Sequence, residues 1–183
     1  HALLARNYEQ VWEEMLRVAL GHEERRQDQF SGRYYLPDRT KHRGVTLKPD
    51  ILTRAKLGAR VIRLVLDAKD YREGNWPATA DVTKQVLYRL LLSDRIYPGA
   101  PPLVEIGNAF LFPAAVSSGA RTRGVHALLG EVLPGSPGVI SALELDLQRV
   151  SAAYLAGRQD LELLDQIARL VLEATPLSPR EGV

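Results

Sequence analysis

Residues 60–69 form a run of branched and apolar side chains that ends in an acid and a lysine, and this run constrains the fold most strongly. Its sequence, Arg60-Val-Ile-Arg-Leu-Val-Leu-Asp-Ala-Lys69, is typical of a buried strand. A second strand is expected over 44–53, and a short basic turn containing Gly58 joins the two. Because the turn is so short, the two strands are expected to be antiparallel neighbours.

The rest of the chain alternates helical and strand patterns. Periodicity predicts helices over 3–20, 81–96 and 160–174, and strands over 103–112, 125–133 and 139–147. Gly21 ends the first helix, and Thr79 or Asp81 is expected to cap the second. The polar segment 22–43 is expected to be a loop with a short strand. The predicted fold is therefore α/β, a mixed sheet flanked by helices, in one domain over residues 1–183.

Composition excludes several classes of protein. The 183 residues include no cysteine, so disulfides and thiolate metal sites are excluded, and a cytoplasmic location is expected. No apolar run approaches the ~20 residues that cross a bilayer, so no membrane partner is expected. Because a helical pattern begins almost at His1, we expect a domain excised from, or partnered with, a separate recognition or motor component.

Basic residues are concentrated between Arg25 and Arg54, although the net charge is only +2. A local patch of this kind attracts phosphates even when the whole chain is nearly neutral. A solvated surface rich in arginine explains the same residues equally well. Arg121 and Arg123, beside the flexible stretch 117–119, would also suit contacts to backbone phosphates.

The strand pair brings acids and a lysine together. Side chains alternate faces along a strand, so Asp67 and Lys69 share one face, roughly 7 Å apart between alpha carbons. Asp50, expected toward the end of the preceding strand, could face Asp67 across the pair. Two carboxylates are the ligands that Mg²⁺ prefers, and Mn²⁺ is expected to substitute. We expect Asp50, Asp67 and the Ala68 carbonyl to hold the metal, while Lys69 orients or activates a water or offsets charge on a phosphate.

The alternative is that Asp50, Asp67 and Lys69 are surface charges that form a weak ion pair. Lys69 fits this alternative well, but Asp67 does not. Asp67 continues an apolar run that should lie near the core, where an unpaired charge is costly. The strand context therefore favours the catalytic interpretation.

Two segments resemble a known nuclease core. Leu47-Lys-Pro-Asp-Ile-Leu52, followed by Leu64-Val-Leu-Asp-Ala-Lys-Asp-Tyr71, is similar to the core of PD-(D/E)XK nucleases. Within that superfamily the chain most resembles the nuclease subunits of McrBC-type and LlaJI-type restriction systems. The likeness extends through Asp81-Val-Thr-Lys-Gln-Val-Leu-Tyr88 and takes in Trp12-Glu13, so that it spans residues 8 to about 92.

The resemblance implies a metal-dependent DNA endonuclease and, by analogy with McrBC, a McrB-like GTPase motor of the AAA+ class as partner. By motif position, Asp50 and Asp67 become metal ligands, Lys69 the catalytic lysine, and Gln85 an accessory residue. Glu13 becomes a further acid at the metal. Each chain would have one site, and cutting both strands of DNA would favour two such sites, so a homodimer is also expected.

The chain departs from the pattern at two places. Gln85 and Tyr88 have two residues between them, whereas the motif is often written with three, so core packing is slightly favoured over a motif role for Tyr88. In the first helix Glu13 and Glu14 are neighbours and cannot both face the site. Glu13 is favoured because it follows Trp12, and Glu9 is a substitute.

Other polar residues carry weaker predictions. The histidines His22, His42 and His126 have no spacing typical of a zinc site or a catalytic triad, although His42 could contact phosphate. Asn108 is expected in a turn or bulge, and Glu144 and Asp146 as surface or cap groups. Two other functions stay open: a nonenzymatic module that binds DNA or a motor subunit, and a nuclease acting on RNA or on free DNA ends.

Overall fold

The computed structural model describes residues 8–23, 30–35, 41–70, 76–96, 104–116, 119–127 and 139–174. In chain order its elements are α2 (Tyr8–Leu20), β1 (Phe30–Tyr35), β2 (Lys41–Leu47), β3 (Ile51–Leu57), β4 (Arg60–Ala68), α3 (Thr79–Ile96), β5 (Val104–Ala114), β6 (Ala120–Ala127), β7 (Val139–Asp146), α4 (Leu147–Leu155) and α5 (Leu161–Glu173).

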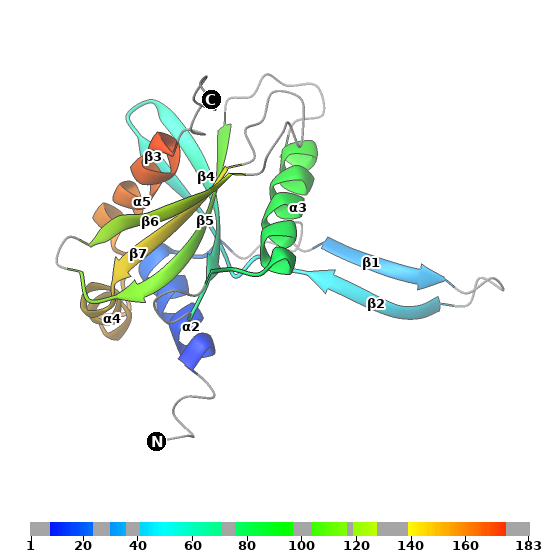
Figure 1. The fold of residues 1–183 in the computed structure, drawn as a ribbon, viewed down its shortest axis with the longest axis horizontal. Helices are drawn as coiled ribbons and strands as arrows, with labels where there is room; N and C mark the ends of the chain where they lie inside the picture. The colour runs from blue at the N-terminus through cyan, green and yellow to red at the C-terminus, as the bar shows by residue number, and fades with distance from the viewer. Residues whose placement is uncertain are drawn as a thin grey trace, which may run out of the picture.

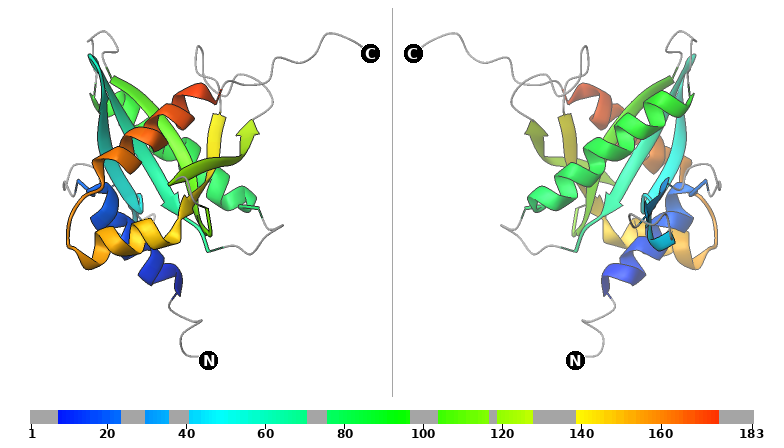
Figure 2. Two further views of the ribbon diagram at one scale, coloured as in Figure 1. Left: turned by 90° about the vertical axis from the view of Figure 1, so that its left-hand side faces the viewer. Right: turned by 90° about the vertical axis from the view of Figure 1, so that its right-hand side faces the viewer.

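A five-stranded mixed sheet forms the centre of the molecule, with strand order β3-β4-β5-β7-β6. The inner strands β4, β5 and β7 are parallel, whereas β3 pairs antiparallel with β4, and β6 antiparallel with β7. Helices cover both faces: α2, α4 and α5 lie on one side of the sheet and α3 on the other (Figures 1 and 2). The predicted α/β architecture, a mixed sheet flanked by helices, is confirmed.

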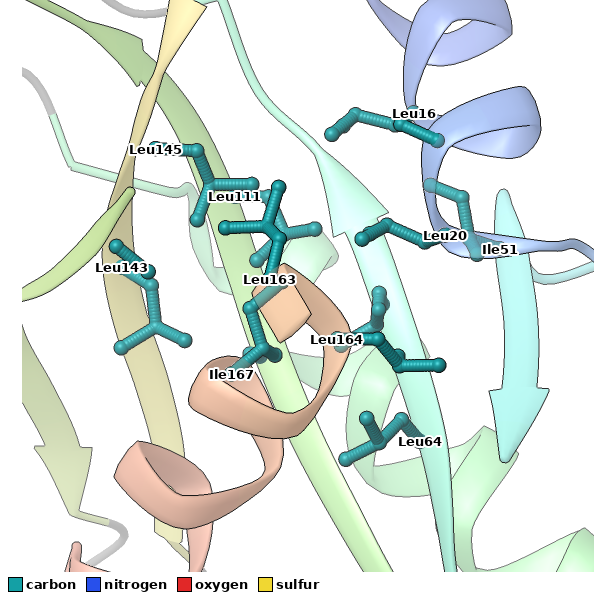
Figure 3. Close-up of a cluster of buried hydrophobic side chains, with 14 of the residues drawn as sticks. Leu16, Leu20, Ile51, Leu64, Leu111, Leu143, Leu145, Leu163, Leu164 and Ile167 are labelled. Atoms are coloured by element: carbon teal, nitrogen blue, oxygen red, sulfur yellow. The ribbon is translucent and has the colours of Figure 1, made fainter. Parts of the chain in front are cut away.

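The larger core lies between the sheet and α5. In Figure 3, Leu163, Leu164 and Ile167 of α5 point toward leucines of the sheet, and Leu16 and Leu20 of α2 close one end of the cluster. On the other face α3 covers two smaller clusters, of which one contains Val65 and Tyr88 and the other Phe110 and Phe112. β4 is therefore buried on both faces, which explains its nearly continuous apolar sequence.

Two predicted strands have different bounds in the structure. The strand expected over 44–53 is two strands, because β2 ends at Leu47, Lys48-Pro49-Asp50 form a break, and β3 begins at Ile51. Proline lacks the N–H that a continuous ladder needs. The strand expected over 125–133 is β6, which begins earlier, at Ala120, and residues 128–133 lie outside the described part of the chain.

β1 and β2 form a separate two-stranded antiparallel ribbon, which occupies part of the segment expected to be a loop with a short strand. The ribbon projects away from the sheet on the side of α3 (Figure 1). Its second strand leads through residues 48–50 into β3, so the ribbon is joined directly to the chain around Asp50.

The helix ends follow from local capping. Asp160 accepts a hydrogen bond from Leu163 N–H (3.0 Å) at the start of α5, and Asp146 caps α4 in the same way. The cap predicted for α3 was wrong in detail: α3 begins at Thr79, and Asp81, inside its first turn, accepts a hydrogen bond from Ala78 N–H (3.0 Å). No helix within the described ranges is long and apolar enough to cross a membrane.

Candidate active site

Asp67 and Lys69 lie at the end of β4, where the strand leaves the sheet. Both are buried, with exposed fractions of 3% and 5%. Lys69 Nζ lies 2.5 Å from Asp67 Oδ2, so the two side chains share one face, as the strand alternation predicts. The simple surface ion pair considered from the sequence does not describe this burial.

Asp50 lies opposite Asp67, immediately before the start of β3. β3 and β4 pair with Ile51 opposite Leu66, and one further step of this register places Asp50 across from Asp67. Ala68 N–H donates to Asp50 Oδ2 at 3.1 Å and so fixes the carboxylate. Asp50 was predicted toward the end of a strand; it actually stands at the break before one, because Pro49 interrupts the ladder.

The two carboxylates disfavour each other's charge. Burial, the charge of Asp67 and the charge of Glu13 together raise the pKa of Asp50 to about 7. Burial also raises the pKa of Asp67, although the adjacent ammonium of Lys69 opposes the shift. A half-buried acid beside a buried one is a costly arrangement that a bound cation would relieve.

Asp81, expected from the sequence only as a helix cap, also contacts Lys69 in the candidate site. Its Oδ1 lies 2.9 Å from Lys69 Nζ, so the lysine is held between Asp67 and Asp81. Burial by itself would lower the pKa of Lys69, but the two carboxylates outweigh it and raise the pKa above its usual range. The acid in the first turn of α3 was visible in the sequence, but only the fold brings it back to Lys69.

Gln85 lies one turn after Asp81 on α3 and is fully buried. Within the described residues, neither atom of its side-chain amide has a hydrogen-bond partner. Its backbone carbonyl accepts a bond from Asn108 Nδ2 (2.7 Å), which ties α3 to the sheet. Asn108 is therefore a buried residue in the middle of β5, and the turn or bulge predicted for it was wrong.

Tyr88 both packs in the core and anchors the chain next to Asp50. It is buried with Leu52, Val65 and Leu92, and its hydroxyl donates to Lys48 O at 2.9 Å. Burial, followed by the charges of Asp50 and Asp67, raises the pKa of Tyr88 to about 12, so the hydroxyl keeps its proton.

The first helix docks beside the site through Trp12. Trp12 Nε1–H and Lys69 N–H both donate to Leu111 O, at 3.1 and 2.9 Å. Glu13 follows Trp12, is partly buried, and forms an ion pair with Arg17 at 2.6 Å. Glu9 and Glu14 are exposed, and Glu13 is the acid of this helix whose charge acts on Asp50.

The remaining polar candidates have structural roles where the structure describes them. His22 Nδ1 accepts a bond from Leu52 N–H, and Glu144 binds Arg121 at 2.6 Å. The side chains of His42 and His126 lie outside the described residues. Over the described ranges, no three histidines or acids come together as a group that could hold a metal ion. Asp50 and Asp67 are a pair, which suits Mg²⁺, because this ion commonly takes one or two carboxylates and fills its other positions with water and phosphate oxygens.

Comparison with models of known protein families identifies a family for this chain. Residues 3–122, about two thirds of the chain, match the family model described as LlaJI restriction endonuclease. The match includes Asp50, Asp67, Lys69, Asp81 and Gln85. A comparison with curated proteins finds no match. The chain belongs to the LlaJI restriction endonuclease family and is a nuclease of a restriction system.

Proposed function

We propose that the chain is a Mg²⁺-dependent DNA endonuclease domain that hydrolyses phosphodiester bonds at Asp50, Asp67 and Lys69. The observation that carries the proposal is the burial of Asp67 and Lys69 at the end of β4, with Asp50 one register step away on the neighbouring segment. A purely structural ion pair would need one acid. Here Asp67 and Asp81 already flank the lysine. Asp50 is a third acid, and the negative charge of Asp67 disfavours its ionised form.

The donor set fits Mg²⁺, and Mn²⁺ is expected to replace it. Asp50 and Asp67 would hold the ion, with the Ala68 carbonyl as a further oxygen donor, and Glu13 would add its negative charge nearby without being a third acidic ligand. The bound ion would polarise a phosphate and lower the pKa of the attacking water. The raised pKa of Asp50 supports this assignment. It means that the charged form of the carboxyl group is disfavoured in the protein alone, and a bound cation would stabilise that form.

Lys69 would act as a cation toward the phosphate. Two carboxylates hold its ammonium and raise its pKa, so the side chain stays protonated near neutral pH. A protonated lysine cannot accept a proton from water. Of the roles expected from the sequence, the offsetting of negative charge in the transition state is therefore the one that we favour.

Gln85 would place an oxygen or a water within the site. Its amide has a free donor and a free acceptor in a fully buried position, among the described residues. A buried donor or acceptor without a hydrogen bond costs free energy, so a ligand that forms these hydrogen bonds binds more tightly. A water or a phosphate oxygen matches both the donor and the acceptor.

The partners follow from the proposed chemistry. DNA is the substrate, and cutting both strands with one site per chain favours a homodimer. A McrB-like GTPase motor of the AAA+ class is a further proposed partner, on the resemblance to McrBC-type systems alone.

The test compares cleavage of plasmid DNA by the wild type, Asp67→Ala and Lys69→Ala, with Mg²⁺ or Mn²⁺ and with a chelator. Lys56→Ala and Glu162→Ala are matched controls, because both residues are exposed and lie in other elements. We expect nicked and linear products from the wild type and the controls, and little product from the site variants.

Equal cleavage by the wild type and both site variants would refute the proposal. If the wild type does not cut, direct metal binding decides, because a missing motor would abolish cleavage and leave the metal site intact. Calorimetric titration with Mn²⁺ should then show binding that Asp50→Ala and Asp67→Ala both lose. A wild type that neither cuts nor binds Mn²⁺ would leave only a binding module.

A further inference from the structure

Arg123 lies over two aromatic rings, those of Phe112 and Trp76, on the side of the sheet that α3 covers. Its guanidinium carbon lies 4.4 Å from the centre of the Phe112 ring and 5.3 Å from that of Trp76. Phe112 is fully buried, whereas Trp76 is 53% exposed. A cation that contacts two rings keeps its charge but loses much of its conformational freedom, so it is preorganised for an anion.

The backbone is shaped to build this stack. The pairing of β6 with β7 shifts register between Thr122 and Gly124, which places Arg123 in a bulge. Bulges re-aim side chains, and here Arg123 is aimed at the face that α3 covers. Gly124 leaves room for the indole, because a Cβ there would lie 2.8 Å from Trp76 Cη2.

Two phenylalanines of β5 connect this stack to the catalytic lysine. Lys69 Nζ lies 5.9 Å from the centre of the Phe110 ring, and Phe112 follows two residues later on the same face of β5. One such step along a strand is about 7 Å. Arg123 therefore lies within about 17 Å of Lys69, a separation of a few nucleotides at roughly 3.4 Å of axial rise per phosphate along one strand.

The neighbouring arginine of β6 is placed differently. Arg121 forms an ion pair with Glu144 at 2.6 Å on the same strand pair, so its charge is largely balanced. Arg123 contacts the rings of Phe112 and Trp76, and a ring contact does not remove the positive charge of its guanidinium. The chain thus provides two arginines two residues apart, of which one is paired with an acid and the other is stacked.

We propose that Trp76, Arg123 and Phe112 form a binding surface for the DNA strand beside the bond to be cut. Arg123 takes a backbone phosphate, and the exposed face of Trp76 covers the adjoining nucleotide. The identity of the ligand as DNA rests on the proposed function, whereas the stack itself rests only on the contacts above. Charge complementarity and continuity with Lys69 favour a nucleic acid strand over a protein partner.

Tryptophan fluorescence tests the contact without any need for cleavage. The chain contains two tryptophans, and Trp12 is fully buried, so quenching by acrylamide reports mainly on Trp76. In the Lys69→Ala background, a short DNA duplex should reduce the acrylamide quenching constant roughly two-fold or more as the indole is covered. The change should disappear in Trp76→Phe. Unchanged quenching under conditions where anisotropy shows the duplex to be bound would overturn the proposal.

The two arginines supply a charge-matched comparison. Arg123→Ala should weaken duplex binding about ten-fold and lower the slope of log affinity against log salt by about 1, while Arg121→Ala should have a clearly smaller effect. Gly124→Ala, which changes no charge, should displace Trp76 and weaken binding as well. Equal losses for Arg121→Ala and Arg123→Ala, with both variants folded by circular dichroism, would contradict a specific role for the stack.

The outcomes separate this inference from the proposed function. If Trp76 is protected and Arg123→Ala weakens binding, but the wild type neither cuts nor binds metal, the stack is supported and the nuclease assignment fails. If the wild type cuts in a metal-dependent way with Arg123→Ala matching its KM and kcat, the nuclease assignment stands and the stack proposal fails.

Discussion

The ammonium of Lys69 lies 2.9 Å from the carboxylate of Asp81, so the end of β4 and the first turn of α3 meet in one ion pair. The same carboxylate accepts the N–H of Ala78 through its second oxygen. Asp81 therefore both caps the N–H of Ala78 at the start of α3 and holds the ammonium of Lys69. A helix that carries Gln85 and Tyr88 is in this way aligned with the strand that carries Asp67.

Asp81→Asn separates these two functions. The amide oxygen can still accept the Ala78 N–H, but the negative charge beside Lys69 is lost. We expect kcat for plasmid cleavage to fall roughly ten-fold, or about 1.4 kcal/mol, with little change in KM or in thermal stability. Asp81→Ala should also lose about 1 kcal/mol of stability with the cap. A kcat equal to that of the wild type would show that Asp81 serves the helix alone.

Asp50→Asn should stabilise the metal-free protein while it abolishes activity. The pKa of Asp50 is about 7 in the folded protein against an ordinary value of 3.8, so the folded state binds more protons than the unfolded state between these values. The stability of the wild type therefore falls as the pH rises through that window. Asp50→Asn has no such titrating carboxyl. Its free energy of unfolding should therefore exceed that of the wild type by an amount that grows with pH and levels off above about pH 7, at about 1–3 kcal/mol.

Urea unfolding at a series of pH values with a chelator measures this difference. Added Mg²⁺ should stabilise the wild type and leave Asp50→Asn nearly unchanged, because a ligand that binds only the folded state raises its stability. A variant that is less stable than the wild type at pH 8 would contradict the unfavourable charge assigned to Asp50.

Residue patterns predicted the parts of the fold that depend on local periodicity. The apolar run before Asp67 identified β4, and the alternation of its side chains placed Asp67 and Lys69 on one face. Asp160 marked the start of α5, because a cap and an apolar stripe are both short-range signals. The shortness of the turn at 58–59, where Gly58 has a positive φ, predicted the antiparallel pairing of β3 with β4.

Contacts between distant segments were beyond such patterns. Asp81 was visible as an acid in the first turn of a helix, but its contact with Lys69 depends on how α3 crosses the sheet. The bulge that aims Arg123 at Phe112 has no marker except Gly124, because any residue can occupy the bulged position. Pro49 was available as a signal for the break before β3, and the expected strand ran through it instead.

Tyr88→Phe tests whether the tyrosine does more than pack. The ring stays in its cluster, and the hydrogen bond from its hydroxyl to Lys48 O is lost. We expect a stability loss of about 1 kcal/mol, together with a measurable drop in kcat, because Lys48 is two residues before Asp50. Thermal unfolding and cleavage assays measure both effects. A loss of stability with kcat unchanged would assign Tyr88 to the core alone.

The ribbon of β1 and β2 should provide electrostatic affinity for DNA. The two strands contain Arg33, Lys41 and Arg43 and no acidic residue, and they project from the body of the molecule (Figure 1). A two-stranded ribbon fits the major groove, and its second strand leads within three residues to Asp50, so DNA bound there would lie beside the site. Replacing all three basic residues by alanine should weaken duplex binding and lower the salt slope by about 2–3.

The matched control for the ribbon replaces Lys56, Arg60 and Arg158, three exposed basic residues outside the ribbon, by alanine. Both triple variants remove the same formal charge, so a long-range field alone would weaken binding equally in the two. Direct contact with phosphates instead depends on where each charge lies, because it acts only within about a Debye length. If the ribbon makes such contacts, the ribbon variant should bind DNA much more weakly than the control variant. Fluorescence anisotropy at several salt concentrations distinguishes the two cases, and equal slopes would assign the ribbon arginines and lysine to a merely solvated surface.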